Sequence, residues 1–335
     1  MKKIIFIGEF LLSFPGGAEK SIYNELLRLK SDYDVIAYTF DTRYLKGTFK
    51  KDFDVINFGL KTTFKFSRFI SLYYLNKRSI MQKLNEIKKE LKSCEYIITQ
   101  GLVAPIVAEF CIKEKIPYHY YIRDEHQVNI FNNYNTGYWW ILKEIKDIVE
   151  FISIHTFKKR NTIALKNADK IISNSKYIAN ILIDDFNLKS IVKYPEVKKF
   201  NFKVNKKDQK YITFIGGKNA MKGYDIVLKI AKRLPQYEFL IVGPYKKAYT
   251  KQNILFMPWQ KDIGNVYKKT KLLLVPSRWN EAFGRVVIEA NSLGIPVITS
   301  DKGGLPEANK NKLNIISIDH VDRWIKRIMQ ILSER

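Results

Sequence analysis

Two glutamates, Glu281 and Glu289, stand eight positions apart in the stretch SRWNEAFGRVVIEANSLGIPV. A strand-like KLLLVPS and a short loop precede them, so a helix is predicted to begin near Phe283 or Gly284. The unpaired amides and the dipole of a helix start attract an anion, and a glycine lets a phosphate approach the backbone without a Cβ. Glu289 then lies about 7 Å further along the axis. There its carboxylate could accept hydrogen bonds from a ribose diol.

An ordinary helix explains the same residues. An acid such as Glu281 near a helix start stabilises the dipole. Arg285 and Glu289 are four positions apart and could form a simple surface pair. Spacing alone favours this second interpretation, because a pair of acids is a weak motif. The choice depends on the surrounding sequence.

Parallel sheets covered by helices are the elements predicted to hold these residues. Strand and helix patterns alternate from KKIIFIGEF to PYHYYIRD, and again from YITFIGG onward, with NIISID predicted as a late strand. The polar, lysine-rich KKFNFKVNKKDQK is interpreted as a linker between two domains. Two doubly wound units imply a cleft between them, where ligands bind at the carboxyl ends of the strands.

Composition narrows the class of protein. The net charge of +25 over 335 residues predicts a field that attracts anions, without saying which anion. Two cysteines do not make a disulfide framework, which indicates a reduced, cytoplasmic setting. The segment MKKIIFIGEFLLSF imitates a signal peptide, but Glu9 interrupts it and a buried first strand is the better interpretation. No stretch reaches the roughly 18 apolar residues of a membrane span.

The stretch PSRWNEAFGRVVIEANSLGIPVITSDKGGLPE resembles the donor-site signature of family-4 glycosyltransferases, which are retaining enzymes of the GT-B fold. The matched pieces are a Pro-Ser that ends a strand, Glu-x-Phe-Gly, the second Glu, Gly-x-Pro-Val and Gly-Gly-x-Pro-Glu. FPGGAEK and FIGGKNAMKGYDIVL extend the resemblance to both halves. It implies an α/β fold with two doubly wound Rossmann-like domains facing a central cleft. The implied segments are an acceptor-side domain (1–200), a nucleotide-sugar domain (201–318) and a helix (319–335) that packs back on the first domain.

The resemblance also implies roles for individual residues. Glu289 would bind the ribose hydroxyls, Glu281 would contact the transferred sugar, and Lys222 would neutralise the leaving diphosphate of a UDP- or GDP-linked donor. No metal is expected if Lys222 and the helix dipole do this, and no compact His/Asp/Cys cluster argues otherwise. The donor-binding positions that the resemblance implies are Gly16, Gly17, Gly216, Gly217, Lys218, Lys222, Ala282, Phe283, Gly284 and Glu289.

Two positions depart from the family pattern. Gly217 stands where an Arg is usual, although Lys218 next to it could reach the same phosphate as a point charge. Arg123 stands where a His of a His-Asp pair is usual, followed by Asp124 and, two residues on, His126. Asp124 is a catalytic candidate and Arg123 and His126 are acceptor-side candidates, but an ordinary polar loop explains them equally well. A catalytically silent relative that binds nucleotide-sugar is therefore the alternative function.

The N-terminal domain is expected to choose the acceptor. Its helical regions 64–92 and 138–160 mix aromatic residues with Lys and Arg, which suits contact with anionic lipid headgroups. The same mixture suits ordinary amphipathic helices packed on a sheet. Together with the charge, the resemblance predicts a saccharide or lipid-linked acceptor in envelope polysaccharide or glycolipid synthesis, at a membrane surface. No recognition motif or zinc spacing indicates nucleic acid.

Overall fold

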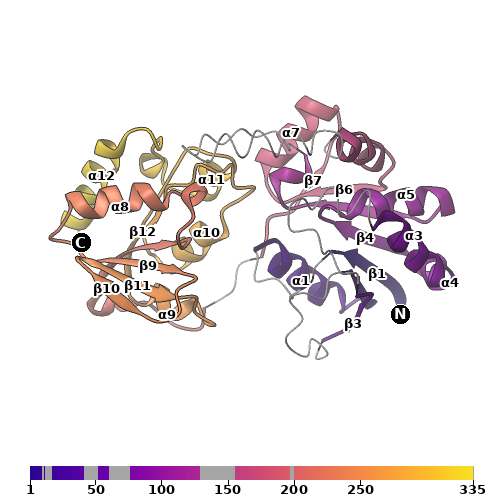
Figure 1. The fold of residues 1–335 in the computed structure, drawn as a ribbon, viewed down its shortest axis with the longest axis horizontal. Coiled ribbons are helices and arrows are strands. Elements are labelled where there is room, and N and C mark those ends of the chain that lie inside the picture. Colours follow the sequence, from indigo (N-terminus) through magenta and orange to yellow (C-terminus); the bar gives the residue numbers. More distant parts are fainter. Residues whose placement is uncertain are drawn as a thin grey trace. The chain divides into compact units, whose positions relative to one another are not determined.

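The protein consists of two compact units that meet in sequence at Glu196/Val197, within a few residues of the predicted boundary. The structure, a computed structural model, describes residues 1–9, 11, 17–40, 52–59, 76–128, 155–196 and 200–334. Each unit holds a mainly parallel sheet with helices packed on it (Figure 1). The two are called the N-terminal and C-terminal units below.

The sheet of the N-terminal unit has the strand order β3-β2-β1-β4-β5-β6-β7, and every pair is parallel. Its strands are β1 Lys2–Gly8, β2 Tyr33–Thr39, β3 Asp54–Asn57, β4 Tyr96–Gln100, β5 Tyr118–Ile122, β6 Lys170–Ser173 and β7 Ile191–Val192. Its helices are α1 Gly17–Leu29, α3 Lys77–Glu86, α4 Lys88–Ser93, α5 Ala104–Glu114, 155–166 and α7 Lys176–Phe186. In the central strand β1, Ile4, Ile5, Phe6 and Ile7 form a run of fully buried apolar residues because helices cover both faces.

The C-terminal unit repeats this plan with the order β10-β11-β9-β8-β12-β13, in which only β10 is antiparallel among the described strands. The strands are β8 Tyr211–Ile215, β9 Phe239–Gly243, β10 Tyr249–Lys251, β11 Ile254–Pro258, β12 Thr270–Val275 and β13 Val297–Thr299. The helices are α8 Tyr224–Arg233, α9 Gly264–Tyr267, α10 Arg285–Ser292, α11 Leu305–Ala308 and α12 Val321–Ser333. Short 3-10 turns are η5 Ala220–Lys222 and η6 Lys312–Asn314.

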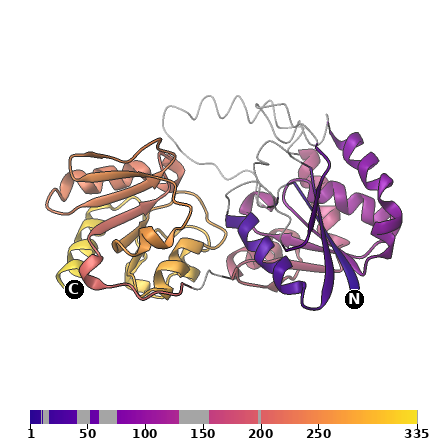
Figure 2. The ribbon, with the colours of Figure 1, turned by 90° about the horizontal axis from the view of Figure 1, so that it is seen from below.

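The chain reverses direction along each sheet at its first strand. β2 lies on one side of β1 and β4 on the other, and β9 and β12 flank β8 in the same way. In doubly wound sheets the loops at such a switch point diverge and leave space for a ligand at the carboxyl ends of the strands. Figure 2 shows the two sheets from a second direction. The fold therefore points to the loops after β8 and β12, and after β1 and β4.

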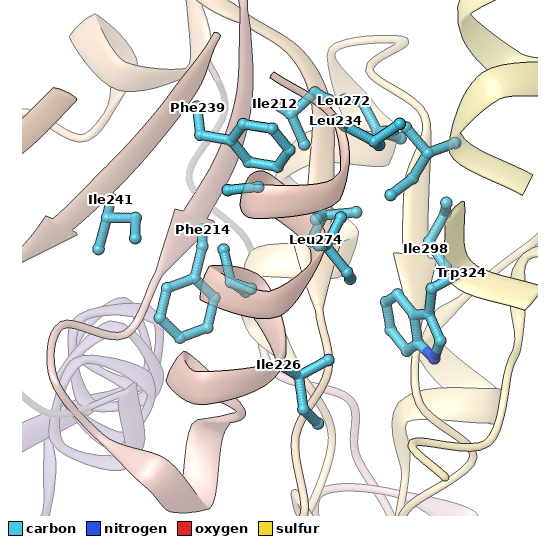
Figure 3. Close-up of a cluster of buried hydrophobic side chains, with 14 of the residues drawn as sticks. Ile212, Phe214, Ile226, Leu234, Phe239, Ile241, Leu272, Leu274, Ile298 and Trp324 are labelled. Atoms are coloured by element: carbon cyan, nitrogen blue, oxygen red, sulfur yellow. The ribbon is translucent and has the colours of Figure 1, made fainter. Parts of the chain in front are cut away.

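One large apolar cluster holds the C-terminal unit together. Phe214 on β8, Ile226 on α8, Leu274 on β12 and Trp324 on α12 are among its members (Figure 3). Trp324 is fully buried and its indole nitrogen donates to the Ser317 carbonyl (3.0 Å). The expectation that the last helix packs on the N-terminal domain needs correction here: the apolar face of α12 is buried on α8, within its own unit.

Local differences from the sequence-based expectations have physical causes. NIISID is no strand: it contains part of η6 and pairs with β13 only through one bridge between Thr299 and Ile315. The predicted linker is partly packed, with Phe200 edge-on against the buried Tyr267 (ring centroids 5.5 Å apart). The region 64–92 contains two helices in its described part, broken at Ile87. Residues 64–75 and 138–154 lie outside the described residues.

Candidate active site

The turn after β8 and the loop after β12 meet at the switch point of the C-terminal unit. Asn219 caps the turn η5 by accepting a hydrogen bond from the Met221 amide (2.9 Å). Gly223, which follows the turn, lies so close to the other loop that a Cβ on it would be 2.0 Å from the Pro276 carbonyl oxygen. The absence of a side chain at Gly223 therefore lets the two loops touch.

This contact brings Lys222 and Glu281 together. The Lys222 ammonium lies 2.7 Å from Glu281 Oε1, and the Ser277 hydroxyl lies 3.5 Å from the same oxygen. The Glu281 carbonyl accepts a hydrogen bond from the Gly304 amide (2.7 Å), which fixes its backbone. The Lys222 side chain is 43% exposed and that of Glu281 is 20% exposed, so an anionic ligand can reach and compete for the ammonium group.

Glu289 is buried among protein partners. It is 8% exposed and both of its carboxylate oxygens have partners within the unit, and its contact with a ribose stays a prediction. The Tyr267 hydroxyl donates to Oε2 (2.8 Å), and Arg285 Nη2 lies 3.5 Å from Oε1. Burial, and then the neighbouring carboxylate, raise the pKa of Tyr267 well above its usual value. The Arg285–Glu289 pair exists, as a buried pair rather than a surface one.

Helix α10 begins at Arg285, one residue after the expected start, with Gly284 before it. A Cβ on Gly284 would lie 2.6 Å from Cδ2 of the fully buried Leu305. Core packing thus already favours glycine here, and the approach of a phosphate to the same backbone stays a prediction. Ala282 and Phe283 are likewise buried, so their backbone rather than their side chains faces any ligand at this helix start.

The backbone conformation at Gly217 is one that favours glycine. Its φ is +61°, and a Cβ on it would lie 2.5 Å from Pro244 Cδ. An arginine would be strained in this backbone. Lys218, the next residue, is exposed, with its ammonium 5.9 Å from the centroid of the Tyr245 ring. A positive charge is therefore present at the end of β8, one position later than usual.

The remaining predicted residues belong to the N-terminal unit. Arg123, which follows β5, is 7% exposed, and its Nη1 donates to the Ser21 hydroxyl on α1 (2.5 Å). Asp124 is half-buried at the start of a 3-10 turn, and its carbonyl accepts from the Gln127 amide (3.1 Å). Gly17 opens α1 and is exposed. Gly16 and the side chain of His126 lie outside the described residues.

Sequence reasoning missed a buried carboxylate in the same region. Glu25 on α1 is 5% exposed and pairs with Lys193 and with Arg28 (3.2 Å). Burial alone would raise the pKa of Glu25, but its hydrogen bonds to Lys193 and Arg28 outweigh burial and lower it. An acid on the apolar face of an amphipathic helix was the available signal. Tyr267 and the pair Asp225–Arg278 were also missed, and no local pattern marks them.

In the ranges that the structure describes, no three His, Cys, Asp or Glu side chains gather closely enough to hold a metal ion. No helix within the described part of the chain combines the length and apolar character that a membrane crossing requires.

The geometry can be compared with known proteins. Residues 196–335 match the family model described as Glycosyl transferases group 1. The matched segment contains every site residue of the C-terminal unit, from Gly216 to Glu289.

Curated relatives share part of the chain. An uncharacterized 41.2 kDa protein in the cps region of Klebsiella pneumoniae is 30% identical over 193 residues, 51% of this chain and 53% of that protein. D-inositol 3-phosphate glycosyltransferase of Mycolicibacterium smegmatis is 31% identical over 145 residues, 38% of this chain and 33% of the relative. The chain thus spans about half the length of the first relative and a third of the second.

Solved structures match nearly the whole chain. HepE from Anabaena, crystallised with UDP and glucose, gives a TM-score of 0.69 at 17% identity, covering 99% of this chain and 90% of HepE. Sucrose-phosphate synthase from Thermosynechococcus elongatus gives 0.69 at 15% identity, with coverage of 99% and 90%. These likenesses establish the fold: the chain is a GT-B protein built from two Rossmann-like units.

Proposed function

We propose that the protein is a retaining glycosyltransferase that moves a sugar from a nucleoside-diphosphate donor to a saccharide or lipid-linked acceptor. The observation that carries this proposal is the exposed ion pair between Lys222 and Glu281 (2.7 Å) at the switch point of the C-terminal sheet. The match to Glycosyl transferases group 1 covers the same residues. The crystallised complex of HepE with UDP and glucose supports a UDP-linked donor.

The proposed chemistry centres on the leaving group. Negative charge develops on the nucleoside diphosphate as the bond to the sugar breaks, and fixed positive groups stabilise that charge. Lys222, the start of α10 and Lys218 would supply them without a metal ion. Glu281, adjacent to Lys222, would contact the transferred sugar. Glu289 would accept hydrogen bonds from the ribose in addition to its bond from Tyr267, because a carboxylate has about four lone-pair sites.

The alternative function is a catalytically silent relative that binds nucleotide-sugar or assists a partner enzyme. Two observations favour it: the backbone at Gly217 has no room for the usual arginine, and Arg123 is buried against Ser21 in the place of the usual histidine. Arginine does not act as a base at neutral pH.

A donor panel separates the two functions. UDP- and GDP-linked sugars would be screened by thermal shift, because a ligand of the native state raises the melting temperature. Each stabilising donor would then be followed for slow nucleotide release, with and without saccharide acceptors. Nucleotide release is the expected result. Stabilisation without turnover for every donor and acceptor would establish the silent relative instead.

We further propose a cytoplasmic protein that docks peripherally on anionic membrane and takes part in envelope polysaccharide or glycolipid synthesis. The relative from the cps region is consistent with this setting, as are the two free, buried cysteines. The charge of +25 supports docking, and so does a surface groove of about 380 Å³ between η6 and α12. Lys312, Arg323, Lys326 and Arg327 line it, and no acidic residue does.

Vesicle sedimentation tests the docking. Binding is expected to need anionic lipid and to weaken as salt rises, because screening shortens the reach of the charges. Equal binding to neutral vesicles would contradict it.

A further inference from the structure

A second ion pair lies close to the Lys222–Glu281 pair in the fold. Arg278, in the loop after β12, meets Asp225, at the start of α8, in a fork: Nη1 lies 2.6 Å from Oδ1 and Nη2 lies 2.7 Å from Oδ2. Two parallel hydrogen bonds between planar groups fix the orientation of both partners, which a single lysine contact does not. The Arg278 side chain is 23% exposed, about half the exposed fraction of Lys222.

Arg278 also binds the backbone of the turn that carries Lys222. Its Nη1 donates to the Ala220 carbonyl (2.7 Å), and its own amide donates to the Met221 carbonyl (2.8 Å). The Trp279 amide donates to that Met221 carbonyl as well (3.1 Å). The residues just before Lys222 are thus tied to the residues just before Glu281.

The two ion pairs differ in what a ligand would do to them. A diphosphate competes with Glu281 for the exposed Lys222 ammonium, so that pair exchanges when an anion binds. The Arg278–Asp225 fork and its backbone bonds do not involve the exchanging groups. They can hold the loops together at the moment when Lys222 turns from the carboxylate to the phosphate.

We propose that Arg278 and Asp225 are positioning residues that keep Lys222 and Glu281 in register while the diphosphate is bound. This inference rests on the proposed nucleotide-binding function. The pair is ionised at neutral pH: burial alone would raise the pKa of Asp225, but the hydrogen bonds and charge of Arg278 outweigh burial and lower it.

The test compares Arg278→Ala, Arg278→Lys and Asp225→Asn with the wild type. Calorimetry would measure the affinities of UDP and of uridine, or of GDP and guanosine if the donor panel selects guanine. Donor turnover would be measured in parallel. We expect Arg278→Ala to weaken the diphosphate about five-fold or more and to lower kcat/KM about ten-fold, because misplaced loops lose a charge-assisted phosphate contact. Nucleoside affinity should stay within about two-fold, and Arg278→Lys should be intermediate because it keeps the charge without the fork.

The matched control is Arg233→Ala, at the opposite end of α8. Arg233 pairs with Asp322 (2.6 Å) on an exposed surface, and its loss should leave both affinities and turnover unchanged. A purely structural role of Arg278 would lower the melting temperature while diphosphate affinity and kcat stay within two-fold of wild type, and this would overturn the inference. If the wild type binds UDP or GDP but turns over no donor, the proposed reaction fails and diphosphate affinity alone decides the inference. A wild type that binds neither nucleotide contradicts both.

Discussion

The sheets of the two units share a switch point at their first strand, but the two units treat charge differently. In the N-terminal unit, Arg123 and Glu25 are at least nine-tenths buried and bonded to neighbouring side chains. In the C-terminal unit, Lys222 and Glu281 form a pair that solvent reaches. A buried pair is expensive to break and fixes structure, whereas a partly exposed pair exchanges partners at low cost. Charge is thus held in fixed, buried bonds in the N-terminal unit, whereas the Lys222–Glu281 pair is open enough to exchange partners.

Removing the buried carboxylate should produce the largest effect. Glu25→Ala leaves Lys193 and Arg28 without their partner. We expect a loss of about 2–3 kcal/mol in the free energy of unfolding. The loss is smaller than for a fully buried pair because both cations are partly exposed. Urea denaturation with hydrogen exchange in β1 would measure it. Glu86→Ala, which breaks an exposed pair with Lys83 in the same unit, is the control and should cost under about 1 kcal/mol. Equal losses would remove the contrast between buried and exposed charge.

The exposed pair should matter for turnover rather than for stability. Lys222→Ala is expected to lower turnover ten-fold or more, about 1.4 kcal/mol or more of transition-state stabilisation. Its melting temperature should change little, because the side chain is 43% exposed. Lys232→Ala, on an exposed part of α8, serves as the control. Near-wild-type turnover of Lys222→Ala would show that Lys218 or backbone amides suffice.

Glu289 combines burial with the ribose contact proposed for it. Replacing it with Ala would leave the buried Tyr267 hydroxyl without its bond, so Glu289→Gln is the cleaner change. We expect Glu289→Gln to weaken nucleotide affinity about five-fold, near 1 kcal/mol. Tyr267→Phe keeps the carboxylate and should lower stability by about 1 kcal/mol with unchanged nucleotide affinity. Calorimetric titration of both variants decides; unchanged affinity in Glu289→Gln would refute the ribose role.

The smallest effect concerns pH and the N-terminal unit. Burial, with the charge of Lys170, lowers the pKa of His119 from 6.5 to about 4. The unfolded chain therefore binds a proton between these pH values that the folded chain does not, and stability should fall as pH drops from 6.5 to 4. The contribution is on the order of 1 kcal/mol after allowing for partial exposure. His119→Phe, which can keep the stacking on Tyr96, should flatten the melting-temperature profile in this window; an unchanged slope would assign it to other groups.

Much of the architecture was predictable because both sheets follow simple periodicity. The strands that begin the two sheets, in KKIIFIGEF and YITFIGG, come from apolar runs bounded by turn residues. The strand β10 was missed because Tyr249–Lys251 is short and all three residues are exposed, so it shows no alternation of buried apolar residues. NIISID was assigned to a strand because its apolar residues alternate in a way that an irregular, partly buried segment also produces.

The candidate site was predictable only in part. The helix start beside Gly284 follows from the strand–loop–helix order, and the structure brings Lys222 and Glu281, both chosen from the resemblance, into contact. The hydrogen bond from Tyr267 to Glu289 could not be predicted from the sequence, because Tyr267 belongs to the separate short helix α9, which only the tertiary fold brings near Glu289. The packing around Gly217 and Gly284 could be seen only in the structure. The side chains that leave no room for a Cβ at these positions, Pro244 and Leu305, are distant in the sequence.

Gly223 limits which amino-acid substitutions the turn after β8 can accept. A single added methyl group there would meet the Pro276 carbonyl oxygen and force the two loops apart. Any such substitution would separate Lys222 from Glu281 although neither residue had changed. Lys218, whose side chain extends from an exposed position, can be exchanged without moving either loop. Substitution in this turn is thus most restricted at Gly223, a residue that has no side chain to offer a ligand.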